Sequence, residues 1–107
     1  MLRSFSYAAE TVRLGSAAGV NLRTEDAELI RIGANFWERW VSAIFLRAYL
    51  DAAAAGGFLP ATIAELRVLL NAYVLEKALY ELGYELNNRP EWIGIPVQGM
   101  LQLLEGE

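Results

Sequence analysis

The chain has 107 residues, 55% of them apolar, and nine basic against thirteen acidic residues give a net charge of −4. Three Trp, five Tyr and four Phe exclude a disordered chain, and the absence of Cys and His excludes disulfides and thiolate or imidazole chemistry. An acidic chain without basic clusters disfavours nucleic acid as a partner. Residues 36–50, the most apolar stretch, carry three charges, so we expect no membrane span, a cytoplasmic location and a single domain over residues 1–107.

The first predicted element is a helix over residues 1–14. Leu2, Phe5, Ala9 and Val12 recur at spacings of three and four, which is the period of one helix face. No Ser, Thr, Asp or Asn stands before this pattern as a capping residue. Such a start is typical of a chain cut inside or just before a helix, and equally of an initiator methionine at a frayed end.

A long second helix is predicted over residues 25–54. Gly15–Gly19 indicates a flexible break before it, and Thr24 is a good N-cap residue. Trp37 and Trp40 share its broad apolar arc, so we expect both in the core. Gly56-Gly57 is expected to end the helix.

A third helix over residues 63–86 and a fourth helix complete an all-α fold of about four helices, a helical bundle. Thr62 and Glu65 have the spacing of a capping box at the start of the third helix. At its end, Asn87-Asn88 favours a left-handed cap and Pro90 biases Arg89 towards an extended form. Residues 92–95 are expected to be extended, with Pro96 as the first residue of a last helix that ends near Leu104.

The third predicted helix has two different apolar stripes. At about 100° per residue, one side gathers three tyrosines and a lysine, with a carboxylate on each flank: Tyr73, Lys77, Tyr80 and Tyr84, flanked by Glu76 and Glu81. The far side is aliphatic and is expected to be core: Val68, Ala72, Leu75, Leu79, Leu82 and Leu86. A helix with two such stripes is expected to be central rather than peripheral.

Two interpretations of the tyrosine stripe stay open on the residues alone. Tyrosine rings suit the C–H face of a sugar, while Glu and Lys hydrogen-bond its hydroxyls, so the stripe favours a polyhydroxylated ligand. Alternatively, Lys77 pairs with Glu81 at i,i+4 and the tyrosines extend to water. Arg89 favours either a ligand contact or capping of the preceding carbonyls. No serine has a His or another evident base to activate it, and no complete catalytic set is present.

Two sequence blocks resemble the maltokinase family, which includes versions fused behind a trehalose synthase domain. Residues 1–9, MLRSFSYAA, are similar to the segment that follows the metal-binding acidic motif of that kinase-like fold. Residues 75–92, LEKALYELGYELNNRPEW, and the following Ile95-Pro96 are similar to the family's C-terminal signature. Residues 58–60 and 66–70 are similar in a looser way, while residues 14–35 carry no distinctive motif.

The resemblance implies a fold related to aminoglycoside phosphotransferases and protein kinases. It implies a transferase that moves the phosphate of ATP to the anomeric hydroxyl of maltose, and maltose 1-phosphate then feeds α-glucan synthesis. The chain lacks the N-terminal lobe, the nucleotide lysine, the catalytic-loop Asp and the metal-binding motif of such kinases. We therefore expect it to be the helical end of a C-terminal lobe, inactive alone, with ATP and Mg²⁺ bound by the rest of the parent kinase chain and no cofactor or metal bound by this segment.

By this resemblance we expect seven residues on the sugar-acceptor side of the cleft, where maltose or a related oligosaccharide binds: Glu76, Lys77, Tyr80 and Glu81, with Tyr84, Arg89 and Tyr7 near them. None is expected to act as a base or nucleophile. The alternative function is a free-standing helical module that builds a homo-oligomer through its aromatic faces. Both hypotheses predict self-association of the isolated chain, because both leave apolar surface exposed.

Overall fold

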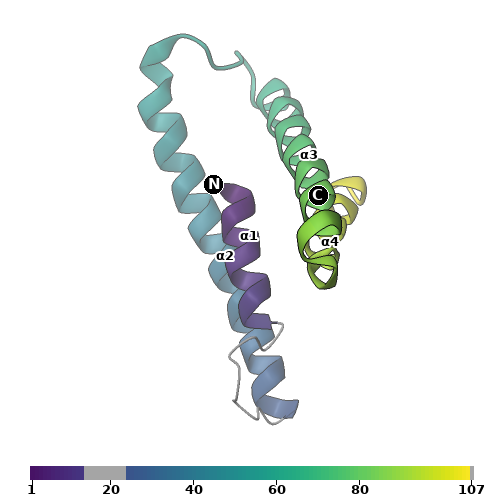
Figure 1. The fold of residues 1–107 in the computed structure, drawn as a ribbon. Coiled ribbons are helices and arrows are strands. Elements are labelled where there is room, and N and C mark those ends of the chain that lie inside the picture. The colour runs from purple at the N-terminus through teal and green to yellow at the C-terminus, as the bar shows by residue number, and fades with distance from the viewer. Residues whose placement is uncertain (14–23, 107) are drawn as a thin grey trace. The chain divides into compact units, whose positions relative to one another are not determined.

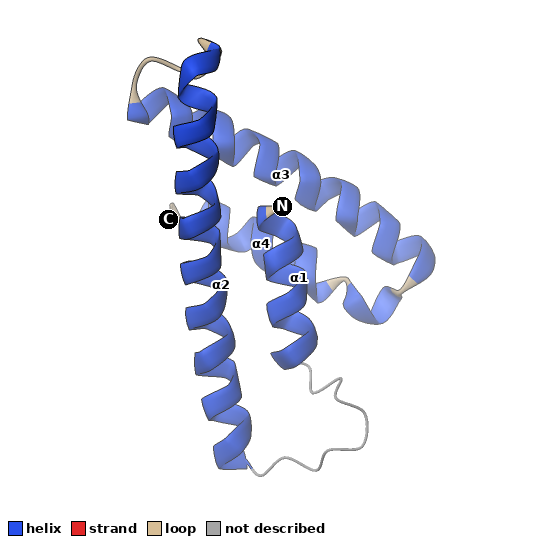
Figure 2. Ribbon diagram, turned by 90° about the vertical axis from the view of Figure 1, so that its left-hand side faces the viewer, coloured by secondary structure: helices blue, strands red, loops and turns tan. Residues whose placement is uncertain are grey.

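The computed structural model describes residues 1–13 and 24–106 and confirms the all-α fold (Figure 1). Within these residues there are four α-helices, two short 3₁₀ helices and no strand (Figure 2): α1 (Leu2–Arg13), α2 (Thr24–Ala53), η1 (Ala54–Gly56), α3 (Ile63–Asn88), η2 (Pro90–Trp92) and α4 (Gly94–Leu104). The chain divides into two compact units, Met1–Ala52 and Ala53–Glu107. A single domain over residues 1–107 stays a prediction.

In the first unit, α1 lies antiparallel to α2 (Figures 1 and 2). The ring of Phe5 meets Trp37 and Phe45 edge to face, with centroids 6.1 and 5.7 Å apart. Ala9 and Ala34 are buried, and small side chains allow two helices to approach closely. The bounds of both helices agree with the predicted ones to within about a residue. The break expected at Gly15–Gly19 and the capping side chain of Thr24 lie outside the described residues.

One side of α2 is apolar and exposed, which contradicts the expected core position of its tryptophans. Trp40 is 61% exposed and stacks on the exposed ring of Phe36, with centroids 6.1 Å apart. Trp37 is also exposed, although its ring lies perpendicular to that of Phe5 and contacts it. α1 has only 12 residues against 30 in α2, so it is too short to cover the whole apolar side of α2.

The second unit begins with the turn that the glycines predict. Gly57 follows η1 with φ of +70°, a left-handed conformation that favours glycine. The Thr62 hydroxyl accepts a hydrogen bond from the Glu65 backbone N–H at 3.2 Å, so α3 begins at Ile63 as the capping box predicts.

α3 packs against η2 and α4, and its buried face differs from the predicted one. The buried residues are Ala78, Glu81 and Glu85 on α3, and Ile95, Pro96 and Gly99 on α4. Most of the aliphatic stripe expected to be core is exposed instead, including Val68 and Leu79. The small side chain of Ala78, which has no exposed surface, suits close helix approach better than a row of leucines does. The expectation that α3 is packed on both stripes is therefore wrong, because the tyrosine stripe is also exposed.

The end of α3 also differs from its prediction. Asn87 and Asn88 remain helical, and their side-chain amides donate to the carbonyls of Gly83 and Tyr84. Arg89 ends the helix instead, with φ of −142° and ψ of 72°. Residues 92–95 are not extended, because the chain passes through η2 straight into α4, where Pro96 is the third residue rather than the first.

Over the described residues, no helix is both long enough and apolar enough to cross a membrane.

Candidate functional site

Three of the predicted site residues form an exposed surface on α3. Tyr80 is 66% exposed and Tyr84 47%, and Tyr73 beside them on the same stripe is also exposed. The Lys77 Nζ atom lies 4.8 Å from the centroid of the Tyr80 ring, a cation–π contact that follows from their i,i+3 spacing and contributes about 0.5–1 kcal/mol at an exposed position. Lys77, Tyr80 and Tyr84 therefore share one face, as the helical period predicts.

The structure separates the two carboxylates expected beside this stripe. Glu76 is exposed, whereas Glu81 is only 8% exposed and lies on the buried face with Ala78. Glu76 is thus the carboxylate on the solvent side of α3 near Lys77. We expected both carboxylates to face the sugar-acceptor cleft and, since they lie on opposite flanks, at most one of them to reach the sugar; Glu81 lies on the buried face of α3.

Arg89 contacts three side chains of the second unit. Its Nε and Nη2 atoms donate to the two carboxylate oxygens of Glu85, at 3.1 and 2.6 Å. Its guanidinium carbon lies 4.1 Å from the ring centroid of Trp92 and 5.4 Å from that of Tyr84. Arg89 thus combines a bidentate ion pair with contacts to two rings, a combination that the planar guanidinium allows and an ammonium does not.

Local backbone structure explains why these groups meet. The Arg89 N–H donates to the Glu85 carbonyl at 2.8 Å and ends α3, and the Trp92 N–H donates to the Arg89 carbonyl at 2.8 Å. Pro90 opens η2 between them and sets the turn. The side chain of Arg89 therefore turns back onto the Glu85 carboxylate.

Glu85 and Trp92 belong to this cluster, and sequence reasoning did not select them. The signals were present: Glu85 precedes Arg89 by four residues, the spacing of a helical ion pair, and Trp92 follows Arg89 by three.

Tyr7 lies in the first unit, on α1, where the Arg3 guanidinium carbon is 6.0 Å from its ring centroid. The other six predicted site residues are in the second unit. A common site for Tyr7 and the α3 residues stays a prediction.

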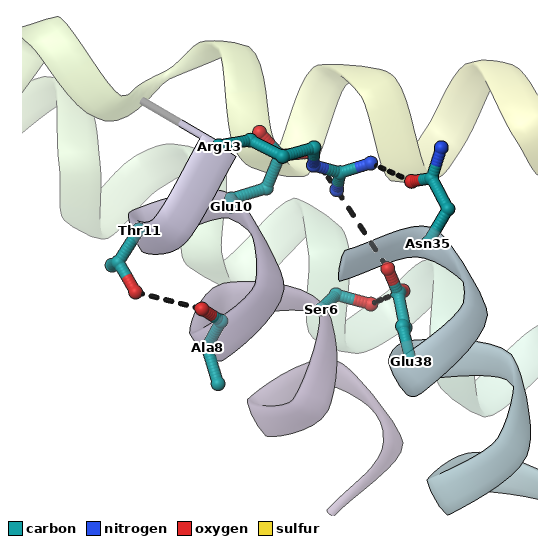
Figure 3. Close-up of polar contacts among 7 residues, drawn as sticks. All are labelled: Ser6, Ala8, Glu10, Thr11, Arg13, Asn35 and Glu38. Carbon is teal, nitrogen blue, oxygen red and sulfur yellow. Dashed lines mark hydrogen bonds and ion pairs between the residues drawn. The ribbon is translucent and has the colours of Figure 1, made fainter. Parts of the chain in front are cut away.

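A polar cluster joins α1 to α2 in the first unit (Figure 3). The Ser6 hydroxyl donates to Glu38 at 2.6 Å. Arg13 contacts Glu10 and Asn35, and its Nη2 atom lies 3.7 Å from a Glu38 oxygen. The cluster fastens the two helices together.

No protein-family model matches the chain, and no solved structure matches it at a significant level. Within residues 1–13 and 24–106, no group of three or more acidic, His or Cys side chains gathers as metal ligands do.

Proposed function

We propose that the chain is the C-terminal helical part of a maltokinase-like sugar kinase of the cytoplasm and contributes the sugar-acceptor side of its cleft. The parent enzyme, with or without a fused trehalose synthase domain, transfers the phosphate of ATP to maltose. This proposal rests on residues 75–92, which resemble the family signature. The block forms the end of α3 and all of η2, and it contains Lys77, Arg89 and two exposed tyrosines.

The chemistry of this surface supports a sugar ligand. Exposed rings such as Tyr80 and Tyr84 offer flat apolar area for the C–H face of a pyranose. The Lys77 ammonium and the Glu76 carboxylate, both exposed, supply a donor and an acceptor for hydroxyl groups. In this proposal the chain's residues bind and orient maltose, and the remainder of the parent kinase supplies ATP, Mg²⁺ and the catalytic base.

A chimera tests the proposal. Residues 1–107 replace the corresponding C-terminal segment of an intact maltokinase, and ATP-dependent formation of maltose 1-phosphate is measured. We expect an active chimera in which Tyr80→Ala raises the KM for maltose about 10-fold, as loss of a binding contact does, and leaves the KM for ATP unchanged. Tyr49→Ala, which removes a similarly exposed tyrosine of α2, is the matched control. A well-folded chimera that forms no product would refute the proposal.

The isolated chain provides a second test. We expect it to form no maltose 1-phosphate from ATP and maltose, because it contains none of the groups that position ATP and its metal. Product formation by the purified 107-residue chain would contradict the proposed division of roles.

A second candidate function, a homo-oligomerisation module, is favoured by the exposed apolar side of α2. Phe36, Trp40 and Ile44 are all more than half exposed, and contiguous apolar surface of this kind typically marks an interface. Sedimentation velocity of wild type and of Trp40→Ser tests it: a strictly monomeric wild type at high concentration argues against this candidate. Association lost in Trp40→Ser, together with an inactive chimera, favours it over the kinase.

A further inference from the structure

A buried carboxylate on α3 has no part in the proposed function. The Glu85 side chain is 1% exposed, yet it accepts both hydrogen bonds from the partly exposed guanidinium of Arg89. A carboxylate removed from water is costly unless it is paired and hydrogen-bonded. The observed bidentate geometry meets that requirement and at the same time fixes the plane of the Arg89 guanidinium.

The fixed guanidinium lies against two aromatic rings. Its central carbon is 4.1 Å from the Trp92 centroid and 5.4 Å from the Tyr84 centroid. Tyr84 remains half exposed, and Trp92 is partly exposed. Arg89 therefore links the buried Glu85 carboxylate to two rings that reach the surface.

We propose that Glu85 is a positioning residue for carbohydrate binding: it holds Arg89, and through Arg89 the rings of Tyr84 and Trp92, as a rigid wall for a pyranose ring. This inference rests on the proposed function and adds Glu85 and Trp92 to its site. A side chain held in its bound orientation loses less conformational freedom when the ligand arrives, so the wall raises affinity without contacting the reacting atoms.

The chimeric kinase described above tests the role of Glu85. Glu85→Gln keeps the size of the side chain and one carbonyl oxygen but removes the charge that orients Arg89. We expect the KM for maltose to rise about 10-fold, with kcat and the KM for ATP within about 2-fold of the wild-type chimera, the pattern of lost ground-state binding. Glu91→Gln, an exposed glutamate in η2, is the matched control and should change nothing.

A second variant covers a failure of Glu85→Gln to fold, detected as loss of far-ultraviolet circular dichroism. Arg89→Lys leaves a cation for Glu85 but removes the planar fork and its stacking on Trp92, so it should raise the KM for maltose by a similar factor. Glu85→Asp, which shortens the carboxylate by one methylene, should restore part of the affinity lost in Glu85→Gln.

The outcomes separate the two proposals. A wild-type chimera that forms no product overturns the proposed function and, with it, the role of Glu85. An active chimera in which the folded Glu85→Gln and Arg89→Lys variants keep the wild-type KM for maltose overturns the positioning role alone. A fall in kcat at an unchanged KM for maltose also overturns it, because that pattern indicates an effect on the transition state rather than on sugar binding.

Discussion

Replacement of Arg13 by alanine is the sharpest test of how the first unit is held together. Arg13 ends α1 and contacts Glu10 on its own helix and Asn35 and Glu38 on α2 (Figure 3). Its side chain is 20% exposed, and those of Glu10 and Glu38 are 19% and 23% exposed. Arg13→Ala therefore leaves two carboxylates close together, partly shielded from water and without their shared cation.

The expected loss of stability follows from this burial. A hydrogen bond to a charged group contributes about 1.5–3 kcal/mol, and the exposed fifth of the side chain lowers the value for the cluster to about 2 kcal/mol. In a chain of this length each kcal/mol lowers Tm by about 4–8 °C, so Arg13→Ala should lower Tm by about 8–16 °C. The Tm of Arg13→Lys should lie between those of the wild type and Arg13→Ala, because one ammonium cannot contact all three partners as the planar guanidinium of arginine does.

Thermal unfolding followed by circular dichroism at 222 nm measures the effect. Arg31→Ala is the control, since Glu28 and Arg31 form an ion pair of the same i,i+3 spacing on the exposed side of α2. An exposed pair is screened by water, so we expect no measurable change in Tm. Equal shifts for Arg13→Ala and Arg31→Ala would refute the claim that burial gives the Arg13 cluster its strength.

Four further predictions concern Thr62, Gly83, Gly57 and the pair of Glu28 with Arg31. Thr62→Ala removes the side-chain cap of α3 and should cost about 1 kcal/mol in denaturant unfolding, whereas Thr62→Ser should cost little. Gly83→Ala should stabilise the chain by about 0.5–1 kcal/mol, because a Cβ there meets no atom within 4 Å. Gly57→Ala should instead destabilise it by about 1 kcal/mol, because its φ is +70°; equal effects at the two glycines would contradict this reasoning. The hydrogen bonds and charge of Arg31 hold the pKa of Glu28 below its ordinary value of 4.5. Any stability from that pair is present above the unfolded pKa and is lost as the pH falls through the folded pKa. NMR titration should show the Glu28 midpoint return to the ordinary range in Arg31→Ala.

Helix positions were predictable because local signals set them. The cap at Thr62 and the left-handed Gly57 are properties of a few neighbouring residues, and both predictions are confirmed. The predicted end of α3 before Asn87-Asn88 and the predicted start of α4 at Pro96 are wrong, and here too local interactions are the cause. The two asparagine side chains bond to carbonyls within α3 and extend it, and η2 lets α4 start two residues before its proline.

The candidate site was predictable only in part. The shared face of Lys77, Tyr80 and Tyr84 follows from the helical period alone. The separation of Glu81 from that face, and the pairing of Glu85 with Arg89, depend on which side of α3 meets its neighbours. Hydrophobicity alone favoured the aliphatic stripe as the buried face of α3, since leucine and valine gain most from burial.

The sequence alone determined the fold class and the ends of most helices, because period, capping and glycine geometry act over a few residues. Only the tertiary structure decided which face of α3 is buried. α4 packs on the side that carries Ala78, where a small side chain permits close approach. Glu81 and Glu85 lie on the same buried face, and the carboxylate of Glu85 pairs with Arg89, which follows the end of the helix. The i,i+4 spacing indicates that Glu85 and Arg89 can pair, but the burial of Glu85 depends on the packing of α3 against η2 and α4, which residue patterns within α3 do not contain.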